Sequence, residues 1–256
     1  MALNNITQKV IDLTEERTGR PVLVTPDASL SLLATVKPAR GSAAVHVVAY
    51  NPSAQADADY LVCYQCGFIL RLFEVPEQDR YDLAGAPQGI SEVEKLIGTH
   101  MKETHLDLDK DTRVGFQDQL FNGLMLQLRS VSVGLRVDDW LRRDYPELGS
   151  QQRAMAARQL NENAAALQPR VRKMTPAKIY QASVAMSAAF AAYWSRAWND
   201  PLPVVPFKTT GHLAQGEQLL KLWDEVPAEP ACDSRLIQAW GKDLGLEGWF
   251  QFVPLA

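Results

Sequence analysis

The chain has 256 residues, of which 46% are hydrophobic and 22% are charged. At about 150 residues per domain, this length fits one large domain or two small ones, and the composition excludes disordered and low-complexity proteins. Lysine and arginine number 26 against 30 acidic residues, for a net charge of -4. No basic run resembles a surface that follows nucleic-acid phosphates. Direct nucleic-acid binding is therefore not expected.

The cysteine count and the first residues indicate where the protein resides. Three cysteines, Cys63, Cys66 and Cys232, are too few for a disulfide framework and indicate a reducing compartment. No signal peptide is visible at the start. The least polar stretch, 179–194, is shorter than the roughly 20 apolar residues that a bilayer requires. We expect a cytoplasmic protein without a membrane segment, in which this stretch forms a buried helix.

The first third of the sequence predicts a helix, a small sheet and a second helix. Apolar spacing from Leu3 to Leu13, followed by Gly19, is typical of an amphipathic helix with a glycine at its end. Three short β-type runs follow, at 22–25, 30–36 and 43–50, and we expect them to form an antiparallel sheet. From Asp57 to the residue before Pro76, the chain is apolar on most helical faces. This second helix belongs in the core.

The remaining sequence is predominantly helical. Residues 74–112 hold ten acidic and four basic side chains, which predicts a solvated loop leading to a helix near 90–100. The later helices are expected at 114–144, 150–167, 176–198, 213–225 and 233–243. Residues 249–254 predict either a closing strand or a segment that docks on another protomer.

These elements predict an α+β, mostly helical fold, in which a small N-terminal sheet packs on a core helix and a helical C-terminal half follows. We place a domain boundary between 1–148 and 149–256. Whether the second range folds separately or continues the same core stays open at this level, as does the oligomeric state.

One pentapeptide in the predicted core helix carries the functional argument. It is Tyr64-Gln65-Cys66-Gly67-Phe68, and it comes after a strand ending Ala-Tyr-Asn-Pro. In the active-site helix of a zinc peptidase, two histidines four residues apart bind the metal, and a glutamate beside the first histidine is the general base. The context here resembles the ImmA/IrrE-like zinc metallopeptidase family, in which His-Glu-x-Gly-His occupies these five positions. Both histidines and the glutamate are replaced.

The resemblance continues on both sides of this helix. Residues 13–24 resemble the opening helix and first strand of the family, and 130–141 resemble the helix that delivers the third metal-binding carboxylate. The resemblance puts Asp138 at that carboxylate position. Gly134 departs from the family, because active relatives are expected to have an acidic residue there. Residues 1–148 are accordingly interpreted as a degenerate zincin-like domain.

The substitutions remove the chemistry of a peptidase. Tyrosine, glutamine and phenylalanine supply neither two imidazole nitrogens nor a titratable carboxylate, so Tyr64, Gln65, Phe68 and Asp138 are degenerate site positions. We expect no catalytic residue, bound metal or cofactor. The resemblance implies a pseudoenzyme that binds a protein partner in a regulatory, stress-response or phage-defence complex.

An active hydrolase with a rearranged site is the main alternative. Cys63 and Cys66 are spaced like a metal-binding pair, and His100 and His105 could complete a Cys2His2 site. Either cysteine could also be a nucleophile if a histidine lay beside it. The apolar helical surroundings instead favour cysteines that serve as small core residues. A structural subunit with an accidental likeness to peptidases is a third interpretation.

Two further patterns suit a protein partner. Residues 129–173 contain nine basic and five acidic side chains, typical of solvated helix faces or of a surface for an acidic partner. Most tryptophans lie in the C-terminal third, where core packing is the default and an interface is the alternative.

Overall fold

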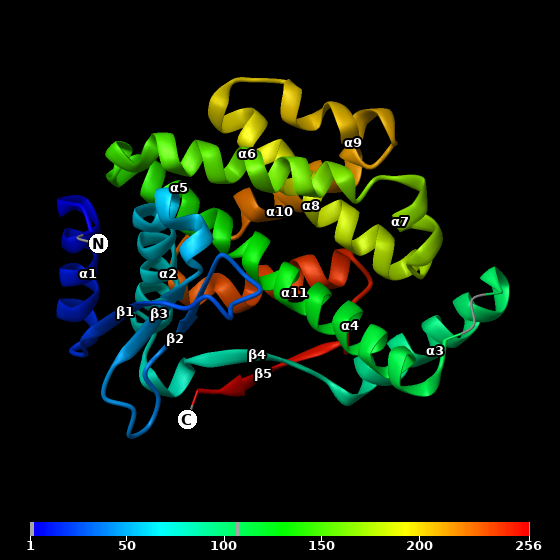
Figure 1. Ribbon diagram of the computed structural model, residues 1–256, viewed down its shortest axis with the longest axis horizontal. Coiled ribbons are helices and arrows are strands. Elements are labelled where there is room, and N and C mark those ends of the chain that lie inside the picture. The colour runs from blue at the N-terminus through cyan, green and yellow to red at the C-terminus, as the bar shows by residue number, and fades with distance from the viewer. Residues whose placement is uncertain (1–2, 106–107, 256) are drawn as a thin grey trace.

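The computed structural model describes residues 3–105 and 108–255 (Figure 1). The first helix, α1 (Asn5–Thr18), begins where the Asn4 side chain accepts a hydrogen bond from the Thr7 N–H, and it ends at Gly19 with a φ of 67°. The left-handed conformation of Gly19 favours glycine and closes the helix, as the sequence predicted.

The N-terminal sheet is mixed. Its strands β1 (Val22–Pro26), β2 (Ala34–Lys37) and β3 (His46–Tyr50) lie in the order β1-β3-β2. β3 is antiparallel to β2 but parallel to β1. The expectation of an antiparallel sheet is therefore wrong for β1 and β3. β2 pairs with the edge of β3 opposite to β1, and β3 lies beside β1 in the same direction. The sheet packs on the core helix α2 (Ala58–Phe73), as expected.

A second sheet joins distant parts of the chain. β4 (Tyr81–Gly85) pairs antiparallel with β5 (Phe250–Pro254). The strand expected at 249–254 is thus present, whereas the loop expected over 74–112 is wrong in two places: it contains β4, and α3 (Pro87–Thr104) begins earlier than predicted. Most of the acidic residues that the structure describes in this range are exposed, and charge provides no signal for a strand whose partner lies so far along the sequence.

The helix expected over 114–144 is divided into α4 (Lys110–Ser132) and α5 (Gly134–Asp144). At the junction, the Ser132 carbonyl accepts a hydrogen bond from the Trp223 indole N–H at 3.2 Å, and the Arg136 N–H donates instead to the Val133 carbonyl at 2.9 Å. The Ser132 hydroxyl also donates to the Leu128 carbonyl, a contact that bends helices. A side chain from the C-terminal half therefore interrupts the helix.

The later helices surround α8 (Ala177–Trp198), which is buried along most of its length. A Cβ at Gly216 in α10 (Leu213–Glu225) would lie 2.5 Å from Ala188 Cβ, so the two helices cross closely. The predicted bounds of α10 and α11 (Asp233–Asp243) are confirmed. The remaining helices are α6 (Gly149–Ala165), α7 (Pro169–Met174) and α9 (Val205–Thr209), with short 3-10 turns η1 (Pro52–Asp57), η2 (Glu77–Asp79), η3 (Pro146–Leu148), η4 (Leu202–Val204) and η5 (Pro230–Cys232).

Two large hydrophobic clusters fill the interior. The larger joins residues of α3, α4 and α5, such as Leu128, to residues of α8, α10 and α11, such as Trp240. The other lies between α1, the mixed sheet, α2 and α5, and it includes Met155 of α6. Both clusters therefore contain residues from either side of position 148. Across the described residues, no helix is both long and apolar enough to cross a membrane. The mostly helical α+β fold with a small N-terminal sheet is confirmed.

Candidate functional site

Tyr64 and Phe68 lie one turn apart on α2, and both face the start of α5. Their rings meet edge to face, with centroids 5.3 Å apart. A Cβ placed on Gly134 would lie 2.2 Å from the Tyr64 hydroxyl oxygen and 3.6 Å from the nearest Phe68 carbon. The α5 position that faces both side chains is therefore Gly134, and the tyrosine hydroxyl occupies the space where a side chain at position 134 would begin.

Gly67 allows α2 and α5 to approach each other. A Cβ at this position would lie 2.4 Å from a Val137 methyl carbon. Any larger residue would push the helices apart, which gives the small fourth residue of the pentapeptide a packing reason that is independent of metal chemistry.

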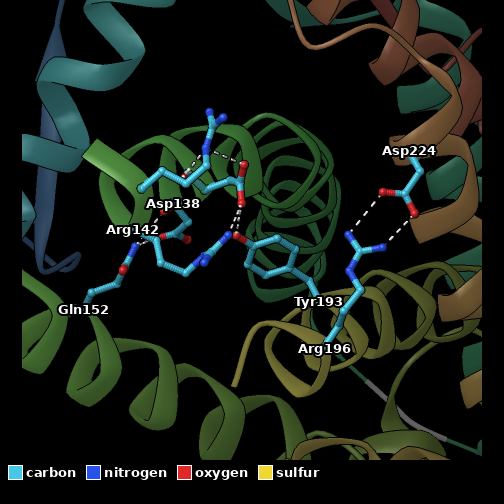
Figure 2. Close-up of polar contacts among 8 residues, drawn as sticks. Asp138, Arg142, Gln152, Tyr193, Arg196 and Asp224 are labelled. Atoms are coloured by element: carbon cyan, nitrogen blue, oxygen red, sulfur yellow. Dashed lines mark hydrogen bonds and ion pairs between the residues drawn. The ribbon is translucent and has the colours of Figure 1, made fainter. Parts of the chain in front are cut away.

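Asp138 lies one turn beyond Gly134 on α5 and is 3% exposed. Its Oδ1 accepts hydrogen bonds from the Tyr60 hydroxyl at 2.7 Å and from the Gln152 amide at 3.0 Å. The same amide donates to the Asp138 backbone carbonyl at 2.9 Å (Figure 2). Burial raises the pKa of this carboxyl to about 6, although both hydrogen bonds act in the opposite direction. Asp138 is thus held by protein donors inside the fold.

Two residues of this network were missed in the sequence. Tyr60 precedes Tyr64 by four residues, so helical spacing alone places both on one face of α2. Burial, together with the Asp138 charge, raises the pKa of Tyr60, which keeps its hydroxyl protonated as a donor. Gln152 comes from α6, and no local pattern indicates that it reaches Asp138.

The neighbouring Asp139 has a different environment. It accepts a hydrogen bond from the Tyr193 hydroxyl at 3.1 Å and forms ion pairs with Arg142 and Arg143. Arg196 of α8 forms a two-pronged ion pair with Asp224 of α10, at 2.8 and 3.1 Å (Figure 2). These contacts tie α5 to α8 and α8 to α10, and so fix the helices behind Asp138.

Cys63 and Cys66 lie on the face of α2 that packs against α1, where both are fully buried. Burial raises the pKa of each thiol to about 12, and the thiols contact Thr7 and Thr14 respectively. A thiol with so high a pKa is almost entirely protonated at neutral pH and is a poor nucleophile. The two cysteines act as small core residues between helices.

The two histidines of the alternative metal site lie elsewhere. His100 is within α3 and His105 ends it in a left-handed conformation, and Figure 1 shows α3 at the far end of the molecule from α2. Over residues 3–105 and 108–255, no three His, Cys, Asp or Glu side chains are grouped as metal ligands would be. The structure does not bring Cys63, Cys66, His100 and His105 together.

A cleft of about 1050 Å³ lies over the site positions that the resemblance predicts. Tyr60, Tyr64, Gln65, Phe68 and Asp138 line its floor. Its walls are residues 31–36 around β2 on one side and parts of α4, α6 and α8 on the other. No sequence pattern indicated the helical wall, because α6 and α8 reach it only through the tertiary fold.

The β2 wall presents a free strand edge. The Asn51 N–H donates to the Leu33 carbonyl at 2.8 Å, and the antiparallel register pairs Thr35 with Ala49. Because hydrogen-bonded and non-hydrogen-bonded pairs alternate in such a ladder, the N–H and C=O groups of Ala34 and Val36 point away from β3. No other strand among the described residues pairs with this edge.

Apolar side chains stand exposed around this cleft. Leu32 beside β2 is 47% exposed, Leu126 of α4 is 50% exposed, and Val171 of α7 is 37% exposed. Together with the unpaired edge, these residues form a surface suited to an extended chain with apolar side chains.

Comparisons with protein-family models, curated proteins and solved structures return no match for this chain. The resemblance to ImmA/IrrE-like metallopeptidases therefore stays a prediction.

Proposed function

We propose that the protein is a catalytically inactive, metallopeptidase-like scaffold that binds an extended segment of a protein partner in its cleft, as part of a regulatory, stress-response or phage-defence complex. The observation that carries this proposal is the free edge of β2, which forms a wall of a cleft of about 1050 Å³. A peptide that adds a strand to such an edge gains main-chain hydrogen bonds, and pockets for alternate side chains give specificity.

The floor of the cleft supports binding without cleavage. Where the resemblance places two histidines there are Tyr64 and Phe68, and Asp138 is engaged by Tyr60 and Gln152. A peptidase needs an activated water or nucleophile beside the scissile bond. Gln65 lines the cleft without a titratable group that could activate one.

The test uses peptides selected on the protein itself. A phage-displayed random library of peptides about ten residues long, which can span β2 with residues on both sides, is selected on the wild-type chain. The selected peptides are resynthesised with a fluorescein label, and their dissociation constants are measured by fluorescence polarisation. Intact peptide mass after incubation reports whether cleavage occurs.

Two matched proline variants locate the binding edge. Val36→Pro removes an outward N–H of β2 without breaking the bonds to β3, and we expect affinity to fall about 10-fold because the peptide loses a main-chain donor. Val24→Pro is the control, because β1 forms the opposite edge of the same sheet and Val24 is likewise a partly buried member of the same hydrophobic cluster. Equal loss in both variants, failure to select any peptide, or cleavage of the selected peptides would overturn the proposal.

A further inference from the structure

Two arginines and one aspartate meet beside the cleft. An Nη2 atom of Arg40 lies 2.6 Å from one Asp82 oxygen, and Nη1 of Arg129 lies 3.4 Å from the other. All three residues line the cleft, and their side chains are 44%, 33% and 29% exposed, in the order Arg40, Arg129, Asp82. Two guanidinium groups thus share a single carboxylate, and one positive charge is left over.

Two other arginines near this cluster have acidic partners of their own. Arg71 makes two contacts with the buried Asp233, at 2.8 and 2.6 Å. At the α6 wall of the cleft, Arg158 pairs with Glu162 one turn away, at 3.2 Å. Of the three arginines that line the cleft, Arg40 and Arg129 therefore share one acidic partner, whereas Arg158 has its own.

The position of this pair relates it to the free edge of β2. Arg40 follows the last residue of β2, Lys37, after only Pro38 and Ala39. Arg129 extends from α4 over the Phe68 ring of the floor, with its guanidinium carbon 5.8 Å from the ring centroid. A chain paired with Ala34 and Val36 advances about 3.3 Å per residue. It therefore approaches the arginines within a few residues of the paired segment.

Among the nine basic residues of 129–173, Arg129 is distinguished by this setting. Arg136 is buried and donates to the carbonyls of Trp223 and Val226. Arg142 and Arg143 both pair with Asp139. Of the nine, Arg129 and Arg158 line the cleft, and Arg158 has Glu162 as its own partner. The alternative in which this basic region serves an acidic partner is thereby assigned, within the cleft, to Arg129.

We infer that the segment bound in the cleft carries an aspartate or glutamate next to the residues that pair with β2, and that Arg129 and Arg40 receive this carboxylate. The inference rests on the proposed function. Guanidinium groups bind carboxylates through paired hydrogen bonds, and Arg129 is the better available of the two because its contact with Asp82 is the longer one. Asp82 holds the two arginines in place and leaves one charge for the partner.

The experiment uses the peptides that were selected on the wild-type chain, and it first sequences them and then measures their binding. Sequencing reports whether Asp and Glu are enriched over Lys and Arg beside the apolar core. Each labelled peptide is then compared with a version in which those acidic residues are replaced by Asn and Gln. Arg129→Gln is expected to weaken the acidic peptide about 10-fold at about 50 mM salt and the amide version less than about twofold. The loss should shrink at about 300 mM salt.

Arg143→Gln is the control, since it removes the same charge from an arginine whose side chain is 60% exposed and which is not among the residues lining the cleft. Peptides that bind the β2 edge without acidic enrichment, or that respond equally to both variants, would overturn this inference and leave the proposed function standing. If no peptide is selected, or if Val36→Pro does not weaken binding, the proposed function fails and this inference fails with it.

Discussion

The polar groups on the floor of the cleft are engaged by other side chains of the protein, whereas the outward backbone groups of its β2 wall have no partner strand. On the floor, the Asp138 carboxylate is occupied by Tyr60 and Gln152, and the Tyr64 hydroxyl fills the space beside Gly134. On the wall, Ala34 and Val36 direct backbone groups toward the cleft without a strand to pair with them. The positions to which the resemblance assigns peptidase chemistry are closed, whereas the surface that could hold a chain is open. Three experiments test that contrast.

The closed floor is tested most severely by adding a methyl group at Gly134. Gly134→Ala would place its Cβ against the Tyr64 hydroxyl, and we expect the free energy of unfolding to fall by about 2 kcal/mol. In a Tyr64→Phe background the hydroxyl is gone, and the same change should cost less than about 0.5 kcal/mol. Urea denaturation of the four proteins measures this coupling.

Gly115→Ala is the control for helix propensity. Gly115 lies inside α4 and a Cβ there meets no atom within 4 Å, so alanine should stabilise the protein by about 0.5–1 kcal/mol. If the effects of Gly134→Ala and Tyr64→Phe simply add, the two residues do not share the same space, and the floor is looser than described.

The second test concerns the charge of Asp138. Its pKa is raised to about 6 in the fold, against about 3.9 in an unfolded chain, so the folded protein binds the proton more tightly. The contribution of Asp138 to stability therefore increases as pH falls through 6 toward 4, and is lost as pH rises through 6. Asp138→Asn should be more stable than wild type at about pH 8, and this advantage should shrink by about 1 kcal/mol at about pH 5.

The comparison with Asp138→Asn is needed because the titration of His46 changes the stability of the protein with pH in the opposite direction. Burial lowers the pKa of His46 to about 4, and its Nδ1 accepts a hydrogen bond from the Ala39 N–H. Acid therefore destabilises the fold through His46 in both proteins, and the difference between the two unfolding curves isolates Asp138. An advantage of the asparagine variant that is independent of pH would show that the carboxyl does not titrate in this range.

The smallest expected effect is that of zinc. Because the described residues hold no group of three metal-ligating side chains, equimolar zinc should leave the Tm unchanged within about 0.5 °C, whereas a structural zinc site contributes several kcal/mol to folding. Elemental mass spectrometry of the purified protein gives an independent reading. Stoichiometric zinc that disappears in a Cys63/Cys66 double variant would reverse the interpretation of the two cysteines as small core residues.

The sequence predicted those elements whose signals are local. The ends of α10 and α11 are marked by proline-containing segments and by apolar spacing, and both were predicted with their observed bounds. The break at Val133 was not, because it depends on the Trp223 indole arriving from α10. β4 was missed for the same reason, since its partner β5 lies at the other end of the sequence.

The candidate site likewise contains residues that the sequence indicated and residues that it did not. Tyr64, Phe68 and Gly134 were singled out by the resemblance to a peptidase family, and the fold places them against one another. Helical spacing could have added Tyr60, four residues earlier on the helix. The cleft itself, Gln152 and the arginine pair of Arg40 and Arg129 depend on which helices and loops come together. No sequence pattern predicts those contacts.

The pairing of β4 with β5 bears on the order in which the protein assembles during synthesis. β4 leaves the ribosome long before β5 exists, and Gly89 of α3 packs directly on the Trp249 backbone, where a Cβ would lie 2.6 Å from its Cα. Contacts between such distant residues form slowly, because a long loop must close first. Until residues 249–254 are translated, β4 lacks its partner strand β5, and the surface around Gly89 on which Trp249 packs is uncovered. The nascent chain therefore has an interval in which this side of the molecule is exposed to aggregation or to chaperones.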